Sequence, residues 1–66
     1  MNFYEHHWAV IRRLRNQCKS LKLLILENRK QGLSETKLSN ELVKTRRILN
    51  SAVRHARILG VPLDFD

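Results

Sequence analysis

The side chains best suited to chemistry in this 66-residue chain are arginines and an asparagine in its C-terminal half. Arg47, Asn50, Ser51 and Arg54 follow one another at i, i+3, i+4 and i+7, a spacing that places them on one face of a helix. Arginine and asparagine make paired hydrogen bonds to the edges of guanine and adenine in a major groove. The spacing therefore predicts a helix face that contacts nucleic-acid bases.

Further polar residues surround this face. Lys37, Lys44 and Arg57 flank it and are expected to contact phosphates, which position a protein without reading sequence. Arg46 lies at the edge of the face and can serve either purpose, and Thr45 is the N-cap of a helix that begins there. The predicted nucleic-acid contacts are Lys37, Lys44, Thr45, Arg46, Arg47, Asn50, Ser51, Arg54 and Arg57.

The charge of the whole chain points in the same direction. It has 13 lysines and arginines against 6 acids, for a formal net charge of +7. All the cations lie between Arg12 and Arg57, and a separate row at i, i+3, i+7 and i+10 comprises Arg12, Arg15, Lys19 and Lys22. A small domain with this excess repels itself unless a polyanion offsets the charge. Nucleic acid is the expected partner, duplex DNA in preference to RNA, because arginine suits phosphates and guanine edges.

Other kinds of chemistry lack the residues they need. No close carboxylate pair, nucleophile with a base, or phosphate-binding glycine loop is present, so we expect no enzyme, no cofactor and no small-molecule substrate. His6 and His7 are adjacent and His55 is distant in sequence, which argues against a metal site. The single cysteine, Cys18, fits a reducing cytoplasmic location, at the nucleoid if DNA is bound. The apolar run Leu23 to Leu26 is far shorter than the ~20 residues of a membrane span.

These residues must be positioned by helices. The first helical segment is expected over residues 3–31, because apolar residues recur there at helical spacing and Gly32 suits a left-handed cap. A second helical region is expected over residues 34–60, with Ser34 as its N-cap and with Gly60 and Pro62 ending it. The chain is thus predicted to be one all-α domain, residues 1–66, with an extended tail from Leu63.

Residues 34–63 resemble the helix-turn-helix of winged-helix regulators of the DeoR and biotin-repressor type. Those families share four parts in a fixed order. They are a helix with the pattern Leu-Ala-x-x-Leu, a turn, the residues Ser-Arg-Arg, and a recognition helix that ends in Leu-Gly-Val-Pro. Leu38–Leu42, Thr45–Arg47 and Leu59–Leu63 take the places of the first, third and last of these. The resemblance implies a DNA-binding transcriptional regulator with a recognition helix at about residues 45–59.

The chain departs from that family at three places. Val43-Lys44 stands where the turn usually has glycine and an apolar residue, Ala56 replaces a larger aliphatic residue, and a β-hairpin wing is not expected. Since β-branched Val43 is unsuited to a left-handed turn, an alternative is one straight second helix and a two-helix antiparallel hairpin. Such a hairpin would bind protein, as an adaptor, an inhibitor or a structural subunit of an RNA–protein particle. A helix break at Val43–Thr45 distinguishes the two architectures.

Self-association is a further expectation. A chain of this size buries a thin core and has no second cysteine for a disulfide, so oligomerisation is a common remedy. Tyr4, Trp8 and Ile11 form an apolar stripe at the start of the first helix. These three residues are predicted to form the interface of a homodimer.

Overall fold

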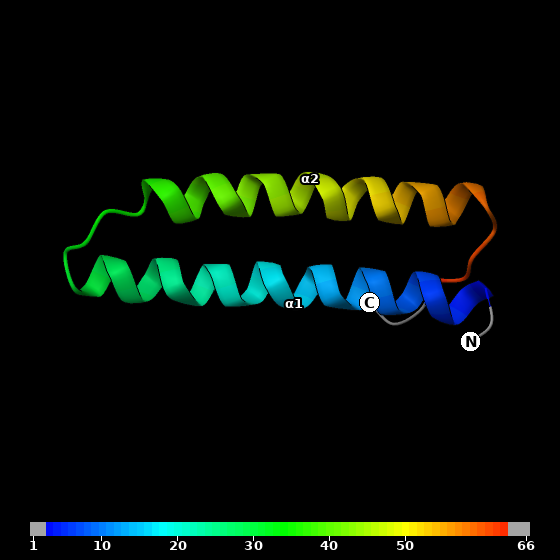
Figure 1. The fold of residues 1–66 in the computed structure, drawn as a ribbon, viewed down its shortest axis with the longest axis horizontal. Coiled ribbons are helices and arrows are strands. Elements are labelled where there is room, and N and C mark those ends of the chain that lie inside the picture. Colours follow the sequence, from blue (N-terminus) through cyan, green and yellow to red (C-terminus); the bar gives the residue numbers. More distant parts are fainter. Residues whose placement is uncertain (1–2, 64–66) are drawn as a thin grey trace.

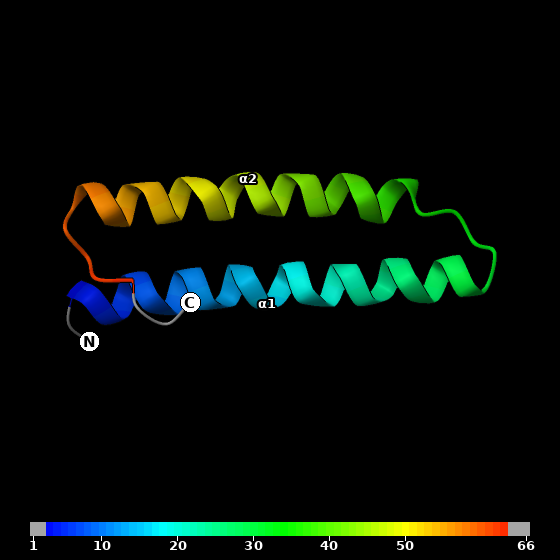
Figure 2. The same ribbon diagram turned by 180° about the vertical axis from the view of Figure 1, so that it is seen from behind.

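The protein folds into two antiparallel helices joined by a short loop. The computed structural model describes residues 3–63, which form α1 (Phe3–Lys30) and α2 (Thr36–Ile58). Figure 1 shows the two helices lying side by side along their whole length, and the view from behind in Figure 2 agrees. The molecule is elongated, with extents of 44 × 18 × 16 Å. The all-α prediction is confirmed, and the architecture is the hairpin that was the alternative.

Helix α2 runs through Val43–Thr45 without a break, so the turn expected there is wrong. The only positive φ angles among the described residues belong to Gly32 and Gly60, and neither lies inside α2. Thr45 does not cap a new helix; its hydroxyl donates a hydrogen bond of 2.8 Å to the carbonyl oxygen of Glu41, one turn back. A threonine inside a helix often bonds in this way. The similarity to a helix-turn-helix therefore does not extend to its turn.

Gly32 ends α1 as predicted. Its φ of +71° is left-handed, which a glycine adopts without steric cost. The amide of the next residue, Leu33, donates a hydrogen bond to the carbonyl oxygen of Asn28 over 2.8 Å. The amide of Gly32 donates one to the carbonyl oxygen of Arg29 over 3.2 Å. These two bonds satisfy carbonyls at the helix end that would otherwise lack partners. The chain then turns back toward α2.

The start of α2 differs from the prediction by one residue. Its N-cap is Glu35, which makes no capping hydrogen bond with its side chain. The hydroxyl of Ser34 instead accepts a hydrogen bond from the Thr36 amide over 3.4 Å. Ser34 thus still satisfies one of the free amides of the first turn, as an N-terminal serine does.

Gly60 ends α2 in the same way, and its cap closes the hairpin. With Gly60 at φ +77°, the Val61 amide donates to the carbonyl oxygen of Ala56 over 2.9 Å. The chain then crosses to α1, where the Trp8 indole N–H donates to the carbonyl oxygen of Pro62 over 2.7 Å. The extended tail predicted from Leu63 onward falls mostly on residues 64–66, outside the described residues.

The core is a single seam between the helices. On α1 the buried residues Ile11, Cys18 and Ile25 recur every seven positions, the spacing of helices that pack at a shallow angle. The best-packed part is a cluster of Ile11, Ala56 and Val61. Trp8, Leu49, Ala52, Val53 and Leu63 pack against that cluster. The apolar residues 49–56 of α2 thus pack on α1, whereas Leu59 stays 45% exposed.

This seam changes the expectation for self-association. Ile11 is only 1% exposed because Ala56 and Val61 cover it, so it is not available to a second copy while the hairpin is closed. Trp8 is half-buried and bonded to Pro62. Only Tyr4 of the predicted interface keeps a large exposed fraction, 42%. Two of the three residues predicted to bind a partner therefore help to close the hairpin instead.

Candidate nucleic-acid interface

The packed seam divides the surface of each helix into two flanks and an outer back. On α1, the buried residues of the seam define two flanks. The residues that come one and four positions after each buried residue lie on one flank. The residues that come one position before and three positions after each buried residue lie on the other flank. The same relation holds on α2 around the row of residues that are spaced seven positions apart and end at Ala56. Each side of the hairpin is therefore made of one flank from each helix.

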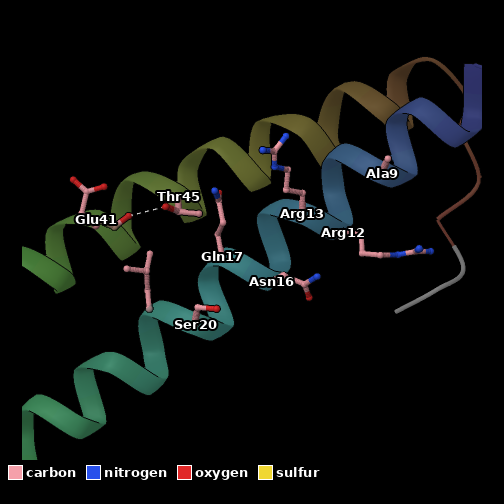
Figure 3. Close-up of a pocket in the computed structure, with 9 residues that line it drawn as sticks. Ala9, Arg12, Arg13, Asn16, Gln17, Ser20, Glu41 and Thr45 are labelled. Carbon is pink, nitrogen blue, oxygen red and sulfur yellow. Dashed lines mark hydrogen bonds between the residues drawn. The ribbon is translucent and has the colours of Figure 1, made fainter.

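A shallow hollow shows which flanks share a side. Arg12 and Arg13 are among its lining residues, and it lies between Gln17 and Leu21 of α1 on one side and Glu41 and Thr45 of α2 on the other. Figure 3 shows Gln17 extending from α1 toward Thr45. The flanks that carry the four residues between which the hollow lies thus face one way. The two remaining flanks must together form the opposite side of the hairpin.

That opposite side gathers most of the cations, and we call it the basic side. Its cations come from both helices: Arg12, Arg15, Lys19, Lys22 and Arg29 of α1, and Arg46 and Arg57 of α2. All of them except Arg15 are exposed, and Arg15 is half-buried. Two acids, Glu5 and Glu35, lie near the two ends of the hairpin. The middle of the basic side is therefore a continuous positive surface.

Few of these cations are neutralised within the molecule. Arg29 forms a two-pronged ion pair with Glu35, whose oxygens lie 3.1–3.2 Å from its nitrogens. The hydrogen bond and the negative charge of Glu35 raise the pKa of Arg29, so this guanidinium stays charged. Arg12, Lys19 and Lys22 make no ion pair within the described residues 3–63, nor do Arg46 and Arg57. These five charges are available to an external anion.

The side with the hollow carries no lysine or arginine on its flanks, and we call it the cation-free side. Its residues are Val10, Leu14, Gln17, Leu21 and Leu24 of α1, and Glu41, Thr45, Ile48, Ala52, His55 and Leu59. Glu41 is the single acid there, and the Lys44 ammonium approaches it to 3.9 Å from the outer edge. Arg13 borders the hollow from the back of α1. The two sides of the hairpin thus differ sharply in charge.

The structure distributes the predicted base-reading residues around the outer half of α2. Arg47, Ser51 and Arg54 lie on its exposed outer back, and Asn50 lies on the basic side. All four are exposed, as the prediction requires. They do not, however, belong to a helix that stands apart from its neighbour, since α2 packs against α1 along its whole length (Figure 1).

The residues predicted to contact phosphates are separated by the fold. Arg57 and Arg46 lie on the basic side, whereas Lys37 and Lys44 lie at the outer edge next to the cation-free side. Thr45 is half-buried on the cation-free side. The predicted set therefore does not form one surface.

The row that sequence reasoning left without a role lies at the centre of the basic side. Arg12, Arg15, Lys19 and Lys22 recur at helical spacing, and that periodicity is visible in the sequence. Whether these four residues share a surface with Arg46 of α2 depends on how the two helices are rotated about their axes relative to each other. Residue spacing within one helix contains no information on that rotation.

Two histidines lie close together at the end of the hairpin opposite the loop between the helices. The ring centroids of His7 and His55 lie 6.0 Å apart, although the residues are distant in sequence. No group of three or more metal-binding side chains occurs among the described residues. Neither helix, within residues 3–63, is long and apolar enough to cross a membrane.

Comparison of the chain with protein-family models, with curated proteins and with solved structures gave no match.

Proposed function

We propose that the protein binds nucleic acid through its basic side, by contacts to the phosphate backbone. The observation that carries the proposal is the clustering of seven of the 13 cations on one side of the hairpin, whereas the opposite side is only bordered by cations, Arg13, Lys37 and Lys44. Phosphate contacts supply most of the affinity of sequence-independent binding. A continuous positive side made from two rigid helices suits such contacts.

The dimensions of the basic side support this proposal. From Arg12 to Arg29 the row on α1 extends roughly 25 Å at 1.5 Å per residue, the length of about seven base pairs. The row on α2 from Arg46 to Arg57 extends roughly 16 Å. Packed helix axes lie about 8–10 Å apart, so the two rows are parallel and close together. Cations of both helices can therefore contact one nucleic-acid segment at the same time.

Sequence-specific binding by α2 as a recognition helix is the competing form of this function. It would use Arg47, Asn50 and Arg54, which are exposed on the outer half of α2. We favour the basic side because it holds more cations and draws them from both helices. The two forms predict opposite effects for two matched pairs of arginines on α2.

The test compares Arg46→Gln/Arg57→Gln with Arg47→Gln/Arg54→Gln. Each double variant removes two exposed arginines from the same helix, so net charge and helix propensity change equally. Binding to a duplex of mixed sequence is measured at several salt concentrations. If the five cations of the basic side without an ion pair contact phosphates, the slope of log K against log salt is about −4.5 for the wild type. The first variant should reduce that slope by about two and weaken binding to every sequence alike.

The second variant should leave the slope nearly unchanged. If Arg47→Gln/Arg54→Gln instead removes a preference for one sequence, α2 acts as a recognition helix. Equal losses in both variants mean that only the net charge matters, which contradicts a defined basic side. If neither variant changes binding, or the wild type binds no duplex, nucleic acid is not the ligand, and a hairpin that binds protein becomes the better account.

A further inference from the structure

The hairpin exposes more surface than a compact protein of its size. Its accessible surface is 5289 Å² for a mass of 7.8 kDa. A compact monomer of that mass exposes about 4,400 Å², so the excess is about 900 Å². The radius of gyration is 14.3 Å, compared with about 11 Å for a compact domain of this length. Two helices in one layer leave both of their sides open.

Large apolar side chains are part of that exposed surface on the cation-free side. Leu24 is 50% exposed, Ile48 57% and Leu59 45%, and Val10 is 39% exposed. They lie among the half-buried Leu14, Leu21 and Ala52. Apolar side chains exposed together on one side of a protein that folds in water are typical of an interaction site.

We propose that the cation-free side binds the same side of a second copy of this chain, which makes a symmetric dimer of four helices. A standard interface buries about 800 Å² per partner, close to the excess surface of the hairpin. A two-fold interface uses one patch on both subunits, and this patch is mostly apolar, with neutral Gln17 and Thr45 and with one carboxylate, Glu41, that Lys44 approaches to 3.9 Å. Burial of Leu24 and Ile48 would supply the hydrophobic stabilisation.

The charge distribution identifies a second copy as the occupant. Two chains of net charge +7 repel each other, and the repulsion is smallest when they meet through the side with the fewest cations, where Arg13, Lys37 and Lys44 lie only at the edges. In that arrangement the two basic sides point outward, separated by about two hairpin thicknesses. Each thickness is 16–18 Å, and a Debye length is about 10 Å at 0.1 M salt, so the outward charges are largely screened from one another. An acidic partner would be attracted to the basic side instead.

The test measures the mass of the protein in solution without nucleic acid. We expect twice 7.8 kDa for the wild type by sedimentation equilibrium. Leu24→Glu and Ile48→Glu should each weaken the dimer on the order of 100-fold or more, because two-fold symmetry buries two unpaired carboxylates. The matched controls are Leu23→Glu and Ile58→Glu, which replace side chains that are 66% and 75% exposed on the outer backs of the same helices. Both controls should remain dimeric.

A second measurement needs no variant and therefore does not depend on how a variant folds. In a mixture of isotope-labelled and unlabelled wild-type chains, intermolecular nuclear Overhauser effects should connect the methyl groups of Leu24 and Ile48 across the interface. Leu23 and Ile58 should show none.

Two results would overturn the proposal. One is a mass of a single chain at about 1 mM, where even an association of about −4 kcal/mol pairs a large fraction of chains. The other is a dimer that Leu23→Glu or Ile58→Glu dissociates while Leu24→Glu does not, since the interface would then lie on the outer backs. Neither result bears on the basic side, whose test uses duplex DNA and different residues.

Discussion

Replacing Ile11 by alanine should destabilise the hairpin strongly. Ile11 is 1% exposed and is the largest fully buried side chain among the described residues. Truncation of a buried isoleucine to alanine costs about 2–5 kcal/mol, through lost burial and the cavity that remains. A protein of this length has a free energy of unfolding of about 3–10 kcal/mol. The single change therefore removes a large part of the total, and the melting temperature should fall by roughly 10–30 °C.

Thermal unfolding followed by circular dichroism at fixed protein concentration measures this effect. Ile11→Val should cost only about 0.5–1.5 kcal/mol, because it removes one methylene group. Leu23→Ala is the control on the same helix, where the side chain is 66% exposed, and it should change stability by about 0.5 kcal/mol or less. An Ile11→Ala protein as stable as Leu23→Ala would refute the assignment of Ile11 to the core seam.

Three further predictions concern the ends of the hairpin. Gly60→Ala should cost about 1–2 kcal/mol in a thermal melt, since alanine resists a φ of +77° even though a Cβ there meets nothing within 4 Å. Trp8→Phe removes the hydrogen bond to Pro62 and should cost about 0.5–1.5 kcal/mol in urea unfolding; no change would mean that this bond does not hold the C-terminal segment on α1. Glu35→Gln breaks the exposed ion pair with Arg29, and the small destabilisation expected at low salt should vanish at high salt.

The helix ends and the core stripe could be predicted from the sequence because local chemistry determines them. Gly32 and Gly60 both adopt the left-handed conformation expected of a glycine that ends a helix. The stripe through Ile11, Cys18 and Ile25 is a property of one helix, and its periodicity is apparent in the residue order. The N-cap was displaced by one residue, from Ser34 to Glu35, which is within the usual ambiguity of helix ends.

The errors arose where the outcome depends on both helices. The expected break at Val43–Thr45 came from a resemblance spread over residues 34–63, yet none of the three residues Val43, Lys44 and Thr45 favours a left-handed turn. Tyr4, Trp8 and Ile11 form a stripe on α1 alone, but in the folded chain Ala56 and Val61 cover Ile11, and Trp8 packs against the same cluster. The basic side likewise exists only because α1 and α2 are antiparallel and rotated so that Lys22 and Arg46 face the same way. That rotation is a result of tertiary packing.

The separation of charge between the two sides is itself an argument for binding. Cations spread evenly over both flanks would repel one another less than seven on one side do, since Coulomb repulsion rises as the distance falls. The chain has neutral side chains on the opposite flanks, such as exposed Gln17 and half-buried Thr45. Nothing in helix formation or in the core seam requires the cations to gather, because Arg12, Lys19 and Lys22 are exposed and touch no acid among the described residues. Coulomb repulsion therefore opposes this gathering of cations in the free protein, and binding of a polyanion, as proposed above, would offset that repulsion.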